Sequence, residues 1–475
     1  MLTSALRTRH AALHHAAHAQ HSSIYTLLTR AAVCACSCWA AVSRDAAGKL
    51  QANATSFPSG MGALGSYLHT RGLRFGIYSS AGTRTCAGRA ASLGHEAIDA
   101  ATFAAWGVDL LKLDNCASTS LPPLQRYPVM RDALAACGRP IVYALCEWGV
   151  DNPATWAGAV GNTWRTSIDI GNFWLSVLLN LEVTEPLWPA AGPGGWNDPD
   201  SLQVGNGGLT SAEERAHFSL WALIKAPLLL GFDVRTASEA TIAMVTNAEV
   251  IAINQDALGV AGRRVWSSLG PWAAAGPFAR LFNYVGGVWS GRDALYIGAL
   301  PFRVAAAACD AYGSECSGFA FDGNASSANA SAPVRLFRRI ERATNASGSA
   351  HLLRSGVFLR AAAAQPADTS AGTFEVWAAP LAGGDVAVVL FNRGLLPARI
   401  TARWVDVGLP ASAPARVRDV WERADRGDFV GSFASAVPSH GVVMLRLTPL
   451  SAPAASTAPG LLARLRAFVA RSVKP

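Results

Sequence analysis

The sequence lacks the features of a membrane-spanning chain and those of a nucleic-acid-binding one. It has no uninterrupted apolar stretch of about 18 residues, the length that a transmembrane helix needs. The net charge is +8, but the basic residues are scattered arginines without a basic run or a recognisable nucleic-acid-binding motif. We therefore expect no integral membrane span and no nucleic-acid partner.

The N-terminus also lacks the expected signals. Residues 1–30 contain no acidic residue and no apolar core of the length found in a secretory signal peptide. Low-complexity sequence without a fold is the favoured interpretation of this segment. A metal-binding histidine tract and an altered start of the coding sequence are the alternatives. The histidines concerned are His10, His14, His15, His18 and His21.

Hydrophobic residues make up 51% of the 475 residues, with 15 Trp and 44 Gly, which favours a large packed enzyme of two or three domains. Nine cysteines and four N-x-S/T sequons favour an oxidising, glycosylating compartment. We predict a secreted, cell-wall, lysosomal or vacuolar protein. The sequons lie at Asn53, Asn324, Asn329 and Asn345, and the last three predict an exposed loop.

From about residue 74 onward, short apolar runs alternate with amphipathic stretches, a pattern typical of parallel β/α units. A closed barrel and a doubly wound sheet both fit this pattern. No run is followed by a G-x-G-x-x-G turn, so the barrel is favoured. The predicted strands are 74–80, 108–115, 140–147, 163–169, 227–234 and 250–256, and the predicted helices include 96–107 and 211–226.

The chain changes character after about residue 265. An Ala/Gly/Ser-rich stretch is followed by runs of period-two alternation, at 374–381, 385–394, 398–408, 415–423 and 441–449, which predict an antiparallel β domain. We predict five segments. These are an N-terminal segment outside the β/α pattern (1–30), a barrel (31–265), an Ala/Gly/Ser-rich segment (266–372), a C-terminal antiparallel β domain (373–449), and a linker and tail (450–475). The tail is either frayed or docked on a partner, or a membrane-surface helix, with the first favoured.

Two acids at the ends of predicted strands are candidates for the paired carboxyl groups of a glycoside hydrolase. Asp114 follows Lys112 by two residues, so both side chains point to the same side of the strand, where Lys112 is expected to keep Asp114 ionised. A structural ion pair is the alternative. Asp169 follows Arg165 by four residues and is interpreted either as a general acid or as an acid hydrogen-bonded at a helix start. In a barrel, such strand ends converge on one mouth.

Several ordered motifs identify the family. GIYSSAGTRTCAG, SLGHEAIDAATFAAWGVDLLKLDNC, GNTWRTSIDI, GPGGWNDPD, HFSLWALIKAPLLLG and EVIAINQDALGV resemble the family-27 glycoside hydrolases, the retaining α-galactosidases and their α-N-acetylgalactosaminidase relatives. The resemblance covers about residues 31–265 and 373–449, and CEWG and VGNTWRT look plant- or alga-like. It implies an α/β fold, a (β/α)8 TIM-type barrel incomplete at its N-terminal strand, followed by a C-terminal antiparallel β-sandwich.

The resemblance also implies roles for individual residues. Asp114 matches the nucleophile and Asp169 the general acid/base. Glu147 matches a position where a large residue favours galactose over N-acetylgalactosamine, and Cys86 and Cys116 match a disulfide between two neighbouring βα loops. No metal or organic cofactor is implied, because two carboxyls suffice. The further predicted substrate contacts are Tyr78, Lys112, Trp148, Arg165 and Asp200, with Trp148 alternatively a buried structural residue.

The sequence also departs from the family. Cys36-Ser37-Cys38-Trp39 stands where the family has Asp-Asp-Cys-Trp, no counterpart of the first strand lies in residues 1–30, and Ser201 replaces the usual Met. Losing two charge-assisted hydrogen bonds, each worth roughly 1.5–3 kcal/mol, would weaken sugar binding.

We therefore predict a retaining α-galactosidase acting on terminal non-reducing α-galactose residues of galacto-oligosaccharides, galactolipids or glycoconjugates. The alternatives are a catalytically impaired sugar-binding protein and an α-N-acetylgalactosaminidase. Relative to the family, residues 1–30 are a non-family segment and residues 266–372 are an insertion. The insertion weakly resembles a PAN/apple-like module, and a decorated loop of no defined function is an equally favoured interpretation. The oligomeric state stays open, a dimer included.

Overall fold

The computed structural model describes residues 32–35, 39–118, 121–268, 282–285, 294–301, 318–321, 331–337, 356–360 and 374–450. The chain divides into two compact units. The first comprises Met1–Ile168 and Gly192–Asp198, and the second comprises Asp169–Ala191 and Pro199–Pro475.

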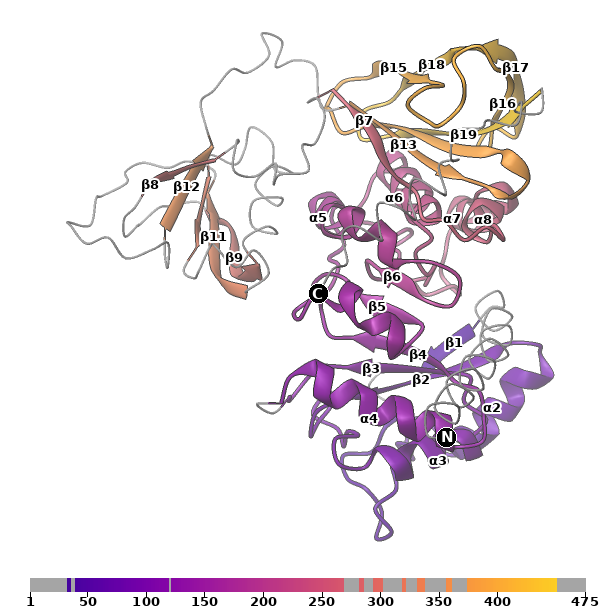
Figure 1. Cartoon of the computed structure of the whole chain (residues 1–475). Helices are drawn as coiled ribbons and strands as arrows, with labels where there is room; N and C mark the ends of the chain where they lie inside the picture. Colours follow the sequence, from indigo (N-terminus) through magenta and orange to yellow (C-terminus); the bar gives the residue numbers. More distant parts are fainter. Residues whose placement is uncertain are drawn as a thin grey trace, which may run out of the picture. The chain divides into compact units, whose positions relative to one another are not determined.

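The first unit is built on a parallel sheet of six strands, in the order β1-β2-β3-β4-β5-β6 (Figure 1). Strand β2 is buried along nearly its whole length, which explains its continuous apolar run, because strands of a parallel sheet are covered on both faces. Within the described residues, β1 stands at the edge of this sheet. The strands are β1 (Ala32–Ala35), β2 (Arg74–Ser80), β3 (Leu110–Asp114), β4 (Val142–Cys146), β5 (Thr163–Arg165) and β6 (Trp196–Asp198).

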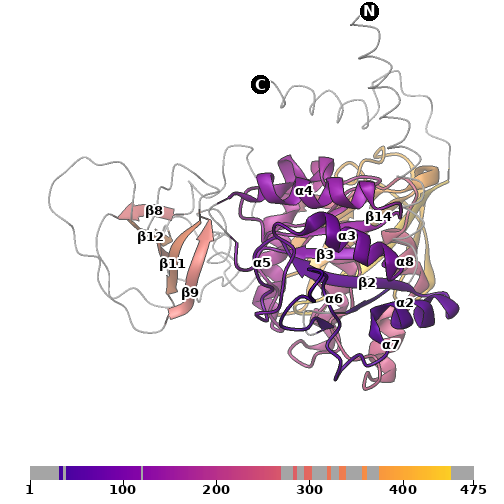
Figure 2. The same cartoon turned by 90° about the horizontal axis from the view of Figure 1, so that it is seen from below.

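An α-helix follows each of the first three strands of this sheet, as the alternating pattern predicts, and two short 3-10 turns lie between β4 and β5. The buried Ala100 and Phe103 form the inward stripe of α3, three residues apart on one helical face. Helices α3 and α4 pack side by side along the sheet (Figures 1 and 2). The helices are α2 (Gly60–Thr70), α3 (Glu96–Ala105) and α4 (Pro123–Ala136), with short 3-10 turns at Pro153–Thr155 and Ala157–Ala159.

The second unit contains four α-helices among its described residues. Helix α6 begins with a capping box, in which the Thr210 hydroxyl accepts the backbone N–H of Glu213 and the Glu213 carboxylate accepts the N–H of Thr210. No helix in the described ranges is both long and apolar enough to cross a bilayer. The helices are α5 (Trp174–Thr184), α6 (Ser211–Leu223), α7 (Glu239–Val245) and α8 (Ala248–Asn254), with a 3-10 helix at Glu185–Ala190.

Two antiparallel sheets complete the C-terminal part of this unit. A six-stranded sheet has the order β17-β16-β19-β14-β13-β7, and β15 pairs with β18 in a second sheet. The two sheets enclose one apolar core, to which Val388, Ile400 and Trp404 contribute. The strands are β7 (Arg263–Ser267), β13 (Phe374–Pro380), β14 (Val386–Asn392), β15 (Ala398–Arg403), β16 (Pro414–Asp419), β17 (Ala424–Val430), β18 (Ser432–Val437) and β19 (Val442–Pro449).

Strand β14 is buried throughout because both of its faces are covered. Val388 and Leu390 point into the core between the two sheets. Val389 and Phe391 point the other way, into a core shared with helices, where Trp221 of α6 joins them. One continuous apolar run therefore contributes to two cores, one on each face of the strand.

The insertion contributes a five-stranded antiparallel sheet in the order β8-β12-β10-β11-β9 (Figure 1). Its strands are β8 (Phe282–Val285), β9 (Ala294–Pro301), β10 (Gly318–Phe321), β11 (Ser331–Phe337) and β12 (Gly356–Arg360). Several predictions lie outside the described residues. They concern the histidine-rich segment 1–30, Cys36-Ser37-Cys38, the sequons at Asn324, Asn329 and Asn345, and the tail after residue 450.

Two strand predictions were wrong, and a third strand is shorter than predicted. Residues 250–256 belong to helix α8 and its end, because the Asn247 side chain accepts the N–H groups of Glu249 and Val250 and starts a helix. In the described residues, 227–234 forms a single parallel bridge, between Leu230 and Leu202, because most of this run is exposed rather than buried between neighbours. The strand predicted at 163–169 ends at Arg165, where its pairing with β6 stops.

Candidate active site

Strands β2 and β3 carry three predicted site residues toward their carboxyl ends. In the register of these strands, Tyr78 lies opposite Lys112 and Ser80 opposite Asp114. Lys112 is half-buried and Asp114 is buried. Side chains two residues apart on a strand share a face, so Tyr78, Lys112 and Asp114 belong to the same side of the sheet. The prediction that Lys112 and Asp114 share a face is confirmed.

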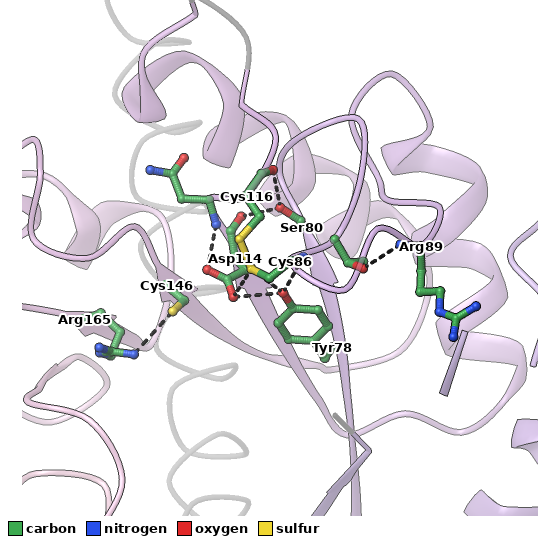
Figure 3. Close-up of a disulfide and its surroundings, with 10 residues drawn as sticks. Tyr78, Ser80, Cys86, Arg89, Asp114, Cys116, Cys146 and Arg165 are labelled. Carbon is green, nitrogen blue, oxygen red and sulfur yellow. Dashed lines mark hydrogen bonds between the residues drawn. A yellow bond between two sulfur atoms is a disulfide. The ribbon is translucent and has the colours of Figure 1, made fainter. Parts of the chain in front are cut away.

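Both carboxylate oxygens of Asp114 accept hydrogen bonds (Figure 3). The Tyr78 hydroxyl donates to Oδ2 at 2.9 Å and the backbone N–H of Asn115 donates to Oδ1 at 2.8 Å. Burial, followed by the negative charge of Asp114, raises the pKa of Tyr78 well above its ordinary value. The phenol therefore stays protonated and remains a donor. A carboxylate held at both oxygens has a defined orientation, which a nucleophile requires.

A disulfide joins Cys86 to Cys116, with 5.1 Å between the two Cα atoms, as predicted. The Sγ atom of Cys86 lies 3.2 Å from Oδ2 of Asp114 (Figure 3). Among the described residues these two sulfurs and Asp114 are also the one close grouping of metal-ligating atoms. Oxidised sulfurs offer no thiolate to a metal, so this grouping fits a structural role for the disulfide rather than a metal centre.

A buried arginine that the sequence did not reveal supports the loop after Asp114. Arg126 of α4 donates to the Ala81 carbonyl at 2.8 Å and to the Asn115 side chain at 2.5 Å. Ser80 adds a hydroxyl bond to the Cys116 carbonyl at 2.9 Å. Arg126 therefore ties the loop after β2 to the loop after β3. Its position in a helix gave no hint of this role, because arginines on helices usually face solvent.

Glu147, directly after β4, is fully buried. Its two carboxylate oxygens accept the backbone N–H groups of Gly149, at 2.9 Å, and Asp151, at 3.1 Å. Burial raises the pKa of Glu147 to about 7. Trp148, the next residue, is half-buried and adopts a left-handed backbone conformation, with φ of 66°. Glu147 thus organises the tight turn that carries Trp148, and its role in sugar selection stays a prediction.

Arg165, the last residue of β5, is also buried. Its guanidinium lies 3.5 Å from the Sγ of Cys146 (Figure 3) and donates to the Ser167 carbonyl at 3.2 Å. Cys146 is the last residue of β4 and lies opposite Asp114 in the strand register. The ends of β3, β4 and β5 therefore carry Asp114, Cys146 and Arg165.

Asp169 and Asp200 both lie in the second unit. Asp169 is exposed in the segment between β5 and α5. Asp200 accepts the backbone N–H of Ile170 at Oδ2 (2.9 Å) and that of Ser201 at Oδ1 (2.7 Å). Its backbone is left-handed, with φ of 86°, and its carbonyl accepts the indole N–H of Trp221 at 2.8 Å. Asp200 therefore fixes the residue that directly follows Asp169. That Asp114 and Asp169 face one sugar stays a prediction.

An oriented, buried carboxylate at the carboxyl ends of parallel strands is typical of β/α-barrel enzymes, whose chemistry is assembled at that edge. Residues 12–256 match the family described as Alpha galactosidase A, and residues 371–447 match the Alpha galactosidase C-terminal beta sandwich domain. The chain belongs to this glycoside hydrolase family. It therefore has the family's barrel followed by a C-terminal antiparallel β-sandwich, which confirms the predicted resemblance and fold class.

Individual relatives agree with this membership. An alpha-galactosidase of Cyamopsis tetragonoloba is 37% identical over 87% of this chain and 76% of its own length. An alpha-galactosidase of Coffea arabica is 39% identical over 87% of this chain and 82% of its own length. The crystal structure of alpha-galactosidase I from Mortierella vinacea superimposes with a TM-score of 0.64 at 29% identity, covering 91% of each chain.

Proposed function

We propose that the chain is a retaining α-galactosidase that hydrolyses terminal non-reducing α-galactose residues. The relatives described above carry the α-galactosidase name, which supports this activity over either alternative. The single observation that carries the proposal is the strand-end carboxylate of Asp114, held at both oxygens by Tyr78 and Asn115.

In the proposed mechanism, Asp114 attacks the anomeric carbon and forms a covalent glycosyl-enzyme. The bond from that carbon to the leaving oxygen breaks as Asp169 gives this oxygen its proton. Asp169, now a carboxylate, takes a proton from water, whose oxygen attacks the anomeric carbon from the face that the leaving group vacated. Asp114 is released as a carboxylate. Two inversions retain the α configuration.

The contacts around Asp114 fit the first of these steps. Attack through one oxygen leaves the other to take the carbonyl role in the ester, and each oxygen already has one donor. Preorganised donors need no rearrangement when the charge moves. Lys112, Trp148 and Arg165 are proposed to contact the galactose, and Glu147 to favour its 2-hydroxyl over an acetamido group.

An oxidising compartment is part of the proposal, because the Cys86–Cys116 disulfide would not persist in a reducing one. Asn53, in a sequon, is half-exposed and is followed by the exposed turn residues 54–56, as an accessible acceptor site requires. Secretion, the cell wall, the lysosome and the vacuole all meet this requirement.

Replacing Asp114 by asparagine tests the proposal. Asp114→Asn keeps the shape of the side chain but removes the nucleophile, so we expect hydrolysis of an aryl α-galactoside to fall by roughly 10⁴-fold or more. Asp132→Asn is the matched control, because Asp132 is an exposed residue of α4 that pairs with its neighbour Arg131. NMR of the first-formed sugar should show α-galactose. Undiminished turnover by Asp114→Asn, or β-galactose as first product, would refute the mechanism.

A further inference from the structure

The segment that carries Asp169 also presents an exposed aromatic ring. Phe173 follows Asp169 by four residues, immediately before α5, and its side chain is 53% exposed. A single exposed apolar side chain is ordinary on protein surfaces and carries no inference alone. What distinguishes Phe173 is how firmly its segment is held.

Backbone hydrogen bonds fix the segment on both sides of Gly171. The N–H of Ile170 donates to Asp200 at 2.9 Å, and the N–H of Gly171 donates to the Ser176 hydroxyl at 2.7 Å. The N–H of Phe173 closes a tight turn onto the Gly171 carbonyl at 2.9 Å. Each of these donors therefore has a defined acceptor, and the path of the chain from Asp169 to Phe173 is set.

Asn172 bonds this segment to a second loop. Its side-chain amide donates to the Asn206 carbonyl at 2.8 Å and accepts the N–H of Gly208 at 3.2 Å. The contact is close, because a Cβ on Gly208 would lie 2.0 Å from the Asn172 carbonyl oxygen. The segment that carries Phe173 and the loop of Asn206 and Gly208 therefore hold each other in place.

The Phe173 ring packs against the backbone of Gly171. A Cβ on Gly171 would lie 2.3 Å from Cε1 of Phe173, so the ring rests directly on the glycine backbone and leaves no room for a side chain there. The neighbouring Trp174 supplies the inward packing of this corner, with its ring 6.0 Å from that of Phe391 and stacked on His440 at 5.7 Å. Phe173 therefore points outward, while the half-buried Trp174 packs against the core.

From these contacts we infer that Phe173 is the platform on which the leaving sugar stacks. This inference rests on the proposed function, in which Asp169 protonates the oxygen that links galactose to its aglycone. The aglycone begins at that oxygen, so the outward-facing side chain on the same braced segment is placed to meet it. An exposed aromatic ring binds the C–H face of a pyranose through dispersion and apolar burial. The favoured substrates are then galactosides whose aglycone is itself a sugar.

The test compares two substrates whose leaving groups are both poor alkoxides. Melibiose leaves a glucose residue that can stack, whereas methyl α-galactoside leaves methanol, which cannot. For Phe173→Ala we expect kcat/KM on melibiose to fall about three- to tenfold, the range of an aromatic stacking contact, while kcat/KM on methyl α-galactoside stays unchanged. Phe173→Trp, which keeps an aromatic ring, should retain the wild-type kcat/KM on melibiose. Leu395→Ala, which removes a 79% exposed side chain from the second unit, should change neither.

A second readout uses the glycosyl-enzyme. Methyl β-glucoside added as an acceptor competes with water for this intermediate, so the ratio of transfer to hydrolysis reports aglycone binding independently of how much enzyme is folded. Phe173→Ala should lower that ratio about three- to tenfold. If Phe173→Ala lowered kcat/KM equally on melibiose and on methyl α-galactoside, or left the ratio of transfer to hydrolysis unchanged, Phe173 would not be the platform for the leaving sugar. A wild-type chain inactive on both galactosides would instead overturn the proposed function.

Discussion

Asp200→Asn changes one oxygen of the side chain that holds the segment carrying Asp169. Asparagine tolerates the left-handed backbone found at this position, φ of 86°, so the substitution should not strain the fold. Asp200 accepts two backbone N–H groups, those of Ile170 and Ser201, one at each oxygen. Asparagine has one acceptor oxygen, and its NH₂ group would face the other N–H. One charge-assisted hydrogen bond is therefore lost, at a cost of about 1.5–3 kcal/mol.

If the lost hydrogen bond serves to position Asp169, Asp200→Asn should lower kcat/KM for substrates whose leaving group must be protonated. It should leave kcat/KM nearly unchanged for substrates whose leaving group needs no proton. A cost of about 1.5–3 kcal/mol corresponds to a roughly ten- to hundredfold fall in kcat/KM. We expect that fall on methyl α-galactoside, whose methoxide must be protonated. On α-galactosyl fluoride, whose fluoride leaves without a proton, we expect a fall of less than about threefold.

Asp233→Asn is the matched control, since Asp233 is an exposed residue of the same unit that pairs with Arg235. It should leave both rates unchanged. Equal losses on the two substrates for Asp200→Asn would refute the positioning role and favour the predicted direct contact with galactose. Unchanged rates on both would show that the Ile170 bond does not matter for catalysis.

Two further predictions concern stability. Arg264→Met should lower the free energy of unfolding by about 3–5 kcal/mol, because among the described residues it leaves Arg393 as the one remaining ion-pair partner of the buried carboxylates of Glu182 and Glu375. Arg263→Met, which removes a contact with the Trp188 ring, should cost under about 1 kcal/mol, and equal shifts in denaturant midpoint for the two variants would contradict this. The pKa of Glu147 is raised to about 7 from an ordinary value near 4.5, so its contribution to stability is full below pH 4.5 and is lost as the pH rises through 7. Relative to Glu147→Gln, the wild type should lose roughly 3 kcal/mol across that window, and parallel pH profiles of unfolding would contradict the assignment.

The strands of the parallel sheet were predictable because burial on both faces makes them continuous apolar runs. The run at 74–80 coincides with β2, and Asp114 and Lys112 share a face, as their spacing implies. Strands β17 and β18 were missed, since β17 is largely exposed and β18 is mostly half-buried, so neither shows a clear apolar alternation. The run at 250–256 misled because a short apolar stretch suits a helix as well as a strand.

By itself the sequence determined the family, the position of Asp114 at the end of a strand and the disulfide, because motifs and periodicity are local properties of the chain. Only the tertiary structure decided which groups hold the segments around Asp114 and Asp169 in place. Arg126 meets the Ala81 carbonyl, 45 residues away, and Asp200 meets the N–H of Ile170, 30 residues away. The burial that raises the pKa of Glu147 likewise comes from neighbours that no motif names. Such contacts depend on how separate elements pack, which no local pattern encodes.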